Sequence, residues 1–203
     1  MERHGGPMTT DGDGEVERSP ASTETLSPED LRERFRGGWT FPEYPEEVEK
    51  NRDLWRDLHE RVRIPEEVEG QLRAISAHRN LLALSEDWCG DAVNILPWVA
   101  HLSDASPKLE LRVVSRDENP NLMDAHLWQG RSRSIPVVIL LDEEFRELDW
   151  WGPRPRELQE WVMGEGLELP VKDRYREVRK WYARDRGDSI VAEILGMLQA
   201  HDR

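Results

Sequence analysis

The sequence contains one cysteine and no long apolar run. Cys89 is the only thiol among the 203 residues, which excludes an internal disulfide and argues against a disulfide-stapled secreted domain. No stretch approaches the ~18 apolar residues that are needed to cross a bilayer. The N-terminus also has no basic segment followed by an apolar one, as a signal peptide would have. We therefore expect a cytoplasmic protein with no membrane partner.

Positive charge is also scarce. The formal net charge is −14, and lysine accounts for only four of the 28 basic residues. An acidic surface repels nucleic acid phosphates and anionic membranes, so neither is an expected partner. Residues 172–186 are the exception, with seven bases against three acids. Such a run is typical of a solvated helix face, and a docking patch is the alternative interpretation.

Tryptophan, in contrast, is plentiful. Its nine occurrences are spread from Trp39 to Trp181, and large aromatic side chains contribute much buried area to a single core. The length favours one domain with extensions. We expect four segments: a disordered acidic N-terminal tail (1–24), an N-terminal helical extension (25–78), a core (79–165) and a C-terminal helical extension (166–203). Met8 is a second candidate for the start of translation.

The spacing of apolar residues predicts the order of the elements. Three amphipathic helices precede any strand, and they begin near Ser27, at Pro45 and at Pro65. The second of these is expected to continue without a break to Val62. The core then reads β-α-β-α-β-β-α, which is a parallel crossover unit followed by an antiparallel hairpin. The expected strands are 81–84, 109–113, 137–141 and 145–151, and the expected helices are 90–102, 119–130 and one after 152. Two further helices are expected to end the chain.

Five landmarks, in order and at compatible spacings, resemble those of thioredoxin-fold proteins. They are Trp88-Cys89-Gly90 for the start of WCGPC, Pro97 in the next helix, Asp117-Glu118-Asn119-Pro120 for D-x-N-P, Ser134-Ile135-Pro136 for the cis-proline segment, and Gly152. The resemblance covers about residues 79–165. It implies an α/β thioredoxin fold, with a central mixed four-stranded sheet flanked by helices, to which extra N-terminal and C-terminal helices are added.

A finer resemblance is to a bacterial subgroup of thioredoxin-like proteins that carry WCGD with a single thiol. It rests on RDENP (116–120), RSIP (133–136), WGPRP (151–155) and a WYxxD-type helix with Trp181, Tyr182 and Asp185. The departure from dithiol thioredoxins is clear, because Ala92 stands where the second cysteine would be. Ala83 likewise stands where the buried acid of dithiol thioredoxins would be. A dithiol cycle is therefore excluded.

A helix that begins near Gly90 would place Cys89 at its N-terminus, where free N–H groups and the helix dipole lower a thiol pKa. The resemblance implies that the Ile135-Pro136 loop faces the thiol and offers backbone groups to an extended ligand. Our preferred hypothesis is a monothiol thiol–disulfide oxidoreductase that forms mixed disulfides through Cys89. The residues expected to bind its substrate are Trp88, Gly90, Asp91, Ile135 and Pro136.

The partner would be a protein or a low-molecular-weight thiol or disulfide. No cofactor is expected other than glutathione as a co-substrate, for whose carboxylates Arg131 and Arg133 are candidates. These two arginines are otherwise expected to be solvated. No metal is expected, because no histidine or second cysteine accompanies the acids around Cys89.

The acids around the cysteine oppose this chemistry. Glu86, Asp87 and Asp91 are negatively charged neighbours of a thiolate, and such neighbours raise a thiol pKa. Asp91 is also expected to cap the helix. The alternative hypothesis is therefore a redox-inactive, thioredoxin-fold protein-binding module that uses the same expected groove between Cys89 and the Ile135-Pro136 loop.

Overall fold

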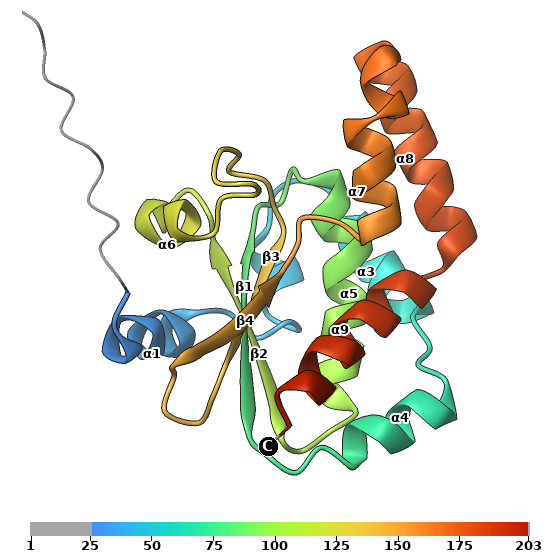
Figure 1. Cartoon of the computed structure of the whole chain (residues 1–203). Helices are drawn as coiled ribbons and strands as arrows, with labels where there is room; N and C mark the ends of the chain where they lie inside the picture. Colours follow the sequence, from blue (N-terminus) through green and yellow to red (C-terminus); the bar gives the residue numbers. More distant parts are fainter. Residues whose placement is uncertain (1–25, 203) are drawn as a thin grey trace, which may run out of the picture.

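The computed structural model describes residues 26–202, so the predicted tail 1–24 lies outside the described residues. A four-stranded mixed sheet runs through the centre of the molecule (Figure 1). The strand order is β2-β1-β3-β4, with β1 parallel to β2 and with β1–β3 and β3–β4 antiparallel. The strands are β1 (Arg79–Ser85), β2 (Leu109–Ser115), β3 (Val137–Leu141) and β4 (Glu147–Trp151). This is the predicted fold class.

Helices surround the sheet on both sides (Figure 1). In the view of Figure 1, α1 and α6 lie to one side of the sheet, and α3, α5 and α9 lie to the other. The helices are α1 (Pro28–Gly37), α2 (Tyr44–Glu47), α3 (Arg52–Arg61), α4 (Glu66–Arg73), α5 (Gly90–Asp104), α6 (Pro120–Ala125), α7 (Arg156–Met163), the 3-10 helix η1 (Glu165–Glu168), α8 (Val171–Asp185) and α9 (Asp188–Ala200).

The central strands are buried because both of their faces are covered. Leu81 to Leu84 of β1 and the whole of β3 are inaccessible to solvent or nearly so, as expected for strands with helices on both faces. At the outer edge of the sheet, Trp39 exchanges two backbone hydrogen bonds with Val113 of β2. This contact shields an edge strand whose N–H and C=O groups would otherwise be free to pair with another chain.

The helix predicted from Pro45 to Val62 is wrong, because the chain breaks it into α2 and α3. The Asp87 carboxylate accepts hydrogen bonds from the backbone N–H groups of Glu49 and Lys50, at 3.1 and 2.8 Å. Asn51 adopts a left-handed conformation with φ of 58° and donates through its side chain to the Asp87 carbonyl at 2.9 Å. The loop after β1 thus takes the N–H groups that a continuous helix would use.

Two further differences from the predicted boundaries have a local cause. The helix expected as far as Gly130 ends at Ala125, after which Gln129 and Gly130 both have positive φ and a β-bridge joins Trp128 to Ser132. The last strand begins at Glu147 instead of 145, because the Asp142 carboxylate accepts from two backbone N–H groups in the turn that precedes it.

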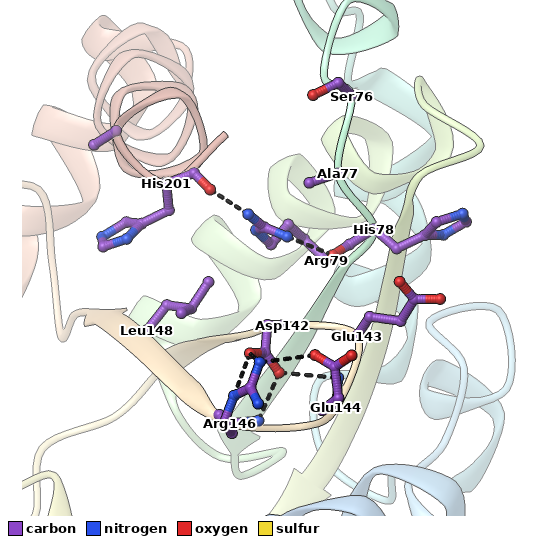
Figure 2. Close-up of a pocket in the computed structure, with 11 residues that line it drawn as sticks. Ser76, Ala77, His78, Arg79, Asp142, Glu143, Glu144, Arg146, Leu148 and His201 are labelled. Atoms are coloured by element: carbon purple, nitrogen blue, oxygen red, sulfur yellow. Dashed lines mark hydrogen bonds and ion pairs between the residues drawn. The ribbon is translucent and has the colours of Figure 1, made fainter. Parts of the chain in front are cut away.

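The residues after α9 bind the start of β1 and the segment before it, at the end of the sheet opposite Cys89. Figure 2 shows Arg79, at the start of β1, donating to the carbonyl of His201 just beyond α9. Asp202 accepts from the backbone N–H groups of Ser76 and Ala77, at 2.9 and 3.1 Å. These contacts fix α9 against the segment that leads into the sheet.

Candidate functional site

Cys89 is the N-terminal cap of α5, directly after the turn that follows β1. Its sulfur accepts a hydrogen bond from the Ala92 N–H at 3.4 Å, and its thiol donates to the Ile135 carbonyl, also at 3.4 Å. Only 7% of the residue is exposed to solvent. The sulfur therefore lies at the start of a helix, as expected, but it is almost covered.

The peptide bond between Ile135 and Pro136 is cis, and the hydrogen bond from Cys89 places it beside the sulfur. Gly152 packs directly against this loop with φ of 141°. A Cβ atom added to Gly152 would lie 2.3 Å from the Pro136 carbonyl oxygen, so only glycine permits the approach.

The environment of Cys89 favours the neutral thiol. Burial raises the pKa of the Cys89 thiol to about 11, and the negative charge of Asp91 adds to the effect. Hydrogen bonds from the Ala92 and Asp91 N–H groups, and the positive charge of Arg154, lower the pKa by less than burial raises it. With that pKa, about one molecule in ten thousand would carry a thiolate at pH 7.

Asp91 was expected to cap the helix but does not, because two partners from other elements bind its carboxylate. It accepts a hydrogen bond from the Arg154 guanidinium at 2.5 Å and one from the Tyr182 hydroxyl at 2.9 Å. All three side chains are largely buried, and Arg154 also donates to the Gln159 side chain at 2.8 Å. We call Asp91, Arg154 and Tyr182 the Asp91 cluster.

The Asp91 cluster joins three motifs that lie far apart in the sequence: WCGD, WGPRP and the WYxxD-type helix α8. Arg154 and Tyr182 received no role in the sequence analysis, although both lie in motifs quoted there. A buried carboxylate needs a cationic or hydrogen-bonding partner, and the arginine between the two prolines of WGPRP was the available signal. Burial raises the pKa of Tyr182 well above its usual value, and Asp91 adds to this effect, so the hydroxyl stays a donor.

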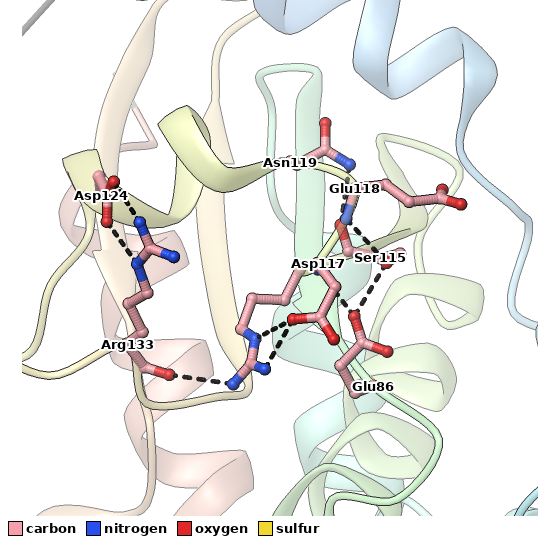
Figure 3. Close-up of polar contacts among 8 residues, drawn as sticks. Glu86, Ser115, Asp117, Glu118, Asn119, Asp124 and Arg133 are labelled. Atoms are coloured by element: carbon pink, nitrogen blue, oxygen red, sulfur yellow. Dashed lines mark hydrogen bonds and ion pairs between the residues drawn. The ribbon is translucent and has the colours of Figure 1, made fainter.

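Glu86 and Asp87 were expected to raise the thiol pKa together with Asp91, but the structure gives them other roles. Figure 3 shows the Glu86 carboxylate accepting from the Ser115 hydroxyl at 2.8 Å and from the Asp117 N–H at 2.9 Å. Asp87 holds the break between α2 and α3. Among the causes of the Cys89 pKa shift, Asp91 is the acid that acts.

Trp88 and Gly90 flank the cysteine. Trp88 is 44% exposed, and the Arg116 guanidinium stacks over its ring at 4.9 Å from the centroid. Gly90 opens α5, and a Cβ atom added there would meet nothing within 4 Å, so its position does not require glycine. The structure thus brings Trp88, Gly90, Asp91, Ile135 and Pro136 around Cys89, with Trp88 as the exposed aromatic side chain among them.

The arginines considered for an anionic ligand lie before the cis-proline loop. Arg133 forms an ion pair with Asp124 at 2.6 Å (Figure 3), and this acid raises the pKa of Arg133. That arginine already has a carboxylate partner, while Arg131 is exposed. Within residues 26–202, no three His, Cys, Asp or Glu side chains gather so as to hold a metal ion.

A hollow of 540 Å³ adjoins the loop on the side of β4. Its walls include the aromatic side chains of Trp128, Trp150 and Trp151, and it shares Gly152 and Arg154 with the surroundings of the cis-proline. The site therefore continues from the covered thiol into an aromatic depression.

A mixed sheet in the order β2-β1-β3-β4, a cysteine at the start of the helix after β1 and a cis-proline against its sulfur together define a thioredoxin-fold protein. A family model described as Thioredoxin matches residues 38–178, and the chain belongs to this thioredoxin family. The same range contains the Asp91 and Arg154 members of the cluster, while Tyr182 lies just beyond it.

Two solved structures share the fold. A protein of unknown function from Pseudomonas aeruginosa matches with a TM-score of 0.67 at 20% identity, over 83% of this chain and 96% of that one. An HIV epitope-scaffold matches with a TM-score of 0.65 at 20% identity, over 83% and 97%. No curated protein matches the sequence. Among the residues that the structure describes, no helix is both long and apolar enough to span a membrane.

Proposed function

We propose that this chain is a thioredoxin-fold binding module of the single-thiol WCGD type, which holds an extended segment of a protein partner on the surface formed by Trp88 and the hollow beside Gly152. The observation that carries the proposal is the state of Cys89. The residue is 7% exposed, and its thiol is hydrogen-bonded to the Ile135 carbonyl and has a pKa raised to about 11. A neutral, covered thiol is a poor nucleophile, and Ala92 supplies no resolving partner.

The surroundings of the thiol support binding better than redox chemistry. An extended segment gains affinity from backbone hydrogen bonds and specificity from side-chain pockets. Trp88 offers an exposed aromatic surface, and the hollow beside Gly152 offers three tryptophan side chains. Tryptophan and arginine are the residues that most often dominate binding energy, and both are present here.

One observation favours monothiol exchange as a second candidate. The Ala92 N–H points at the Cys89 sulfur, as needed to stabilise a thiolate at a helix N-terminus. In that case the thiolate would attack one sulfur of a partner disulfide, and the other sulfur of the partner would leave as a thiolate. A glutathione thiolate would then attack the partner sulfur of the mixed disulfide, forming a disulfide between glutathione and the partner and releasing the Cys89 thiolate. Burial and Asp91 outweigh the helix N-terminus here, which ranks this candidate second.

A glutathione challenge separates the two functions. Native protein incubated with oxidised glutathione at pH 7.4 should show no mixed disulfide by intact-mass measurement. The same protein in urea should form one, because unfolding exposes the thiol and returns its pKa to the ordinary value. A mixed disulfide on native protein that is absent from Cys89→Ser would favour the oxidoreductase instead.

Selection of peptides from a random library tests the binding function itself. Selected peptides should bind wild type and Cys89→Ser with equal affinity, since the thiol is not a reagent. They should bind Trp88→Ala more weakly, by about tenfold, as expected when one aromatic anchor is lost. A library that yields no peptide sensitive to Trp88→Ala would count against the proposed binding surface.

A further inference from the structure

The molecule has a second hollow whose charge is opposite to that of the whole chain. It has a volume of 640 Å³ and lies where the end of α3, the middle of α5 and the α8–α9 turn come together (Figure 1). Four arginines line it: Arg61, Arg63, Arg179 and Arg186. No aspartate or glutamate is among the described residues that line it, although the chain carries a net charge of −14.

These arginines form few ion pairs with carboxylates. Arg61 has Asp57 at 3.8 Å, in a pair whose two side chains are both well exposed, and such a pair contributes little energy. Arg63 donates to the backbone carbonyls of Glu60 and Val62. Within residues 26–202, Arg63, Arg179 and Arg186 form no ion pair. Four like charges around one depression repel each other, and an anion bound among them would relieve that repulsion.

The floor of the hollow is apolar. It includes the side chains of Leu58, Trp98 and Ile190. The indole of Trp98 lies against the bare backbone of Gly187, where an added Cβ atom would come within 2.2 Å of the ring. Gly187 has φ of 85°, a conformation that favours glycine. This residue therefore forms part of the turn between α8 and α9 and also leaves room for the tryptophan. The ring is therefore held in place as part of the floor.

We propose that this hollow, which we call the arginine groove, binds a small amphipathic anion with an alkyl or aryl body and a carboxylate or phosphate head. The volume lies within the ~300–1,000 Å³ range of small-molecule sites, which combine mostly apolar walls with a few placed polar groups. The guanidinium fork matches the oxygens of a carboxylate or phosphate in bidentate pairs, and the apolar body covers Trp98 and Leu58. The arginine groove shares no described lining residue with the hollow beside Gly152, and the hydroxyl of its Tyr182 donates to Asp91.

Titration calorimetry with decanoate tests the proposal. Decanoate should bind with one site per chain, while decanol and decyltrimethylammonium, which lack the negative charge, should bind at least about tenfold more weakly. Inorganic phosphate alone should also bind weakly, because it lacks the apolar body. Raising the salt concentration should weaken decanoate binding, since exposed arginines are screened.

Variants localise the site. Arg63→Gln and Arg179→Gln should each weaken decanoate binding by about tenfold. Leu58→Gln should also weaken it, because it removes part of the apolar floor that the alkyl chain covers. Arg184→Gln is the matched control, because Arg184 lies on the same helix and carries the same charge but lines a different hollow with Trp161 and Trp181. Circular dichroism would confirm that each variant is folded. The absence of saturable decanoate binding, or equal weakening by Arg179→Gln and Arg184→Gln, would overturn the proposal.

Discussion

Replacement of Asp91 by asparagine is the sharpest perturbation of the site. Asp91→Asn keeps the shape of the side chain but leaves Arg154 cationic and largely buried, with 17% of its side chain exposed. Two unit charges about 4 Å apart interact by about 4 kcal/mol at an effective dielectric constant near 20. Removing one partner of a buried pair costs about 3–5 kcal/mol. Because Arg154 keeps its hydrogen bond to Gln159, we expect a loss of about 3 kcal/mol in unfolding free energy, near the lower end of that range.

Urea unfolding at pH 7, followed by tryptophan fluorescence, measures this loss. The control is Asp124→Asn, which breaks the ion pair with Arg133 where both side chains are about half exposed. That variant should lose no more than about 1 kcal/mol. Adding Arg154→Met to Asp91→Asn should recover part of the stability, since it removes the unpaired charge. A loss in Asp91→Asn no larger than in Asp124→Asn would refute the role assigned to the Asp91 cluster.

The same variant should change the thiol. Asp91 raises the pKa of Cys89 and Arg154 lowers it, so removing the carboxylate should lower the thiol pKa and speed alkylation at neutral pH. An alkylation midpoint identical to that of wild type would show that Asp91 does not act on the sulfur.

Four further variants test the scaffold around the site and the thiol itself. Gly152→Ala should lose about 2–4 kcal/mol of unfolding free energy, because its Cβ atom would strike the Pro136 carbonyl oxygen. In Gly90→Ala the added Cβ atom would meet open space, so the unfolding free energy should be unchanged or higher. Equal stabilities of Gly152→Ala and Gly90→Ala would contradict this expectation. Asp87→Ala should lose about 1–2 kcal/mol and speed amide exchange over residues 48–51, since two N–H groups lose their acceptor. Unchanged exchange there would argue against the role of Asp87. Between about pH 9 and 11, wild type should lose up to about 3 kcal/mol relative to Cys89→Ala. The folded-state thiol pKa is the raised one, so its ionisation favours the unfolded chain, and parallel pH curves for the two proteins would contradict the shift.

Much of the fold could be predicted because its signals are local. The continuous apolar runs of β1 and β3 identify buried strands, and β3 spans the predicted residues 137–141. The landmarks from Trp88 to Gly152 gave the topology through resemblance, and the strand order agrees with it. The break between α2 and α3 could not be predicted, because the groups that cause it come from Asp87, more than 30 residues away.

The site was only partly predictable for the same reason. The placement of Cys89 at a helix start follows from the strand-to-helix change, but the burial of its sulfur depends on Ile135 and on the packing around it. The sequence shows Asp91 as one of three acids near a thiol. Only the tertiary structure distinguishes it from Glu86 and Asp87, by giving it Arg154 and Tyr182 as partners.

The rate of Cys89 alkylation as a function of pH tests the central claim most directly. Iodoacetamide, which is small enough to limit steric effects, should react with the native protein along a curve whose midpoint is near pH 11. Protein unfolded in urea should give a midpoint near the free-thiol value of about 8.5. A native midpoint at or below that of the unfolded protein would mean that the thiolate is stabilised in the fold. That result would contradict the binding-module account and favour the oxidoreductase.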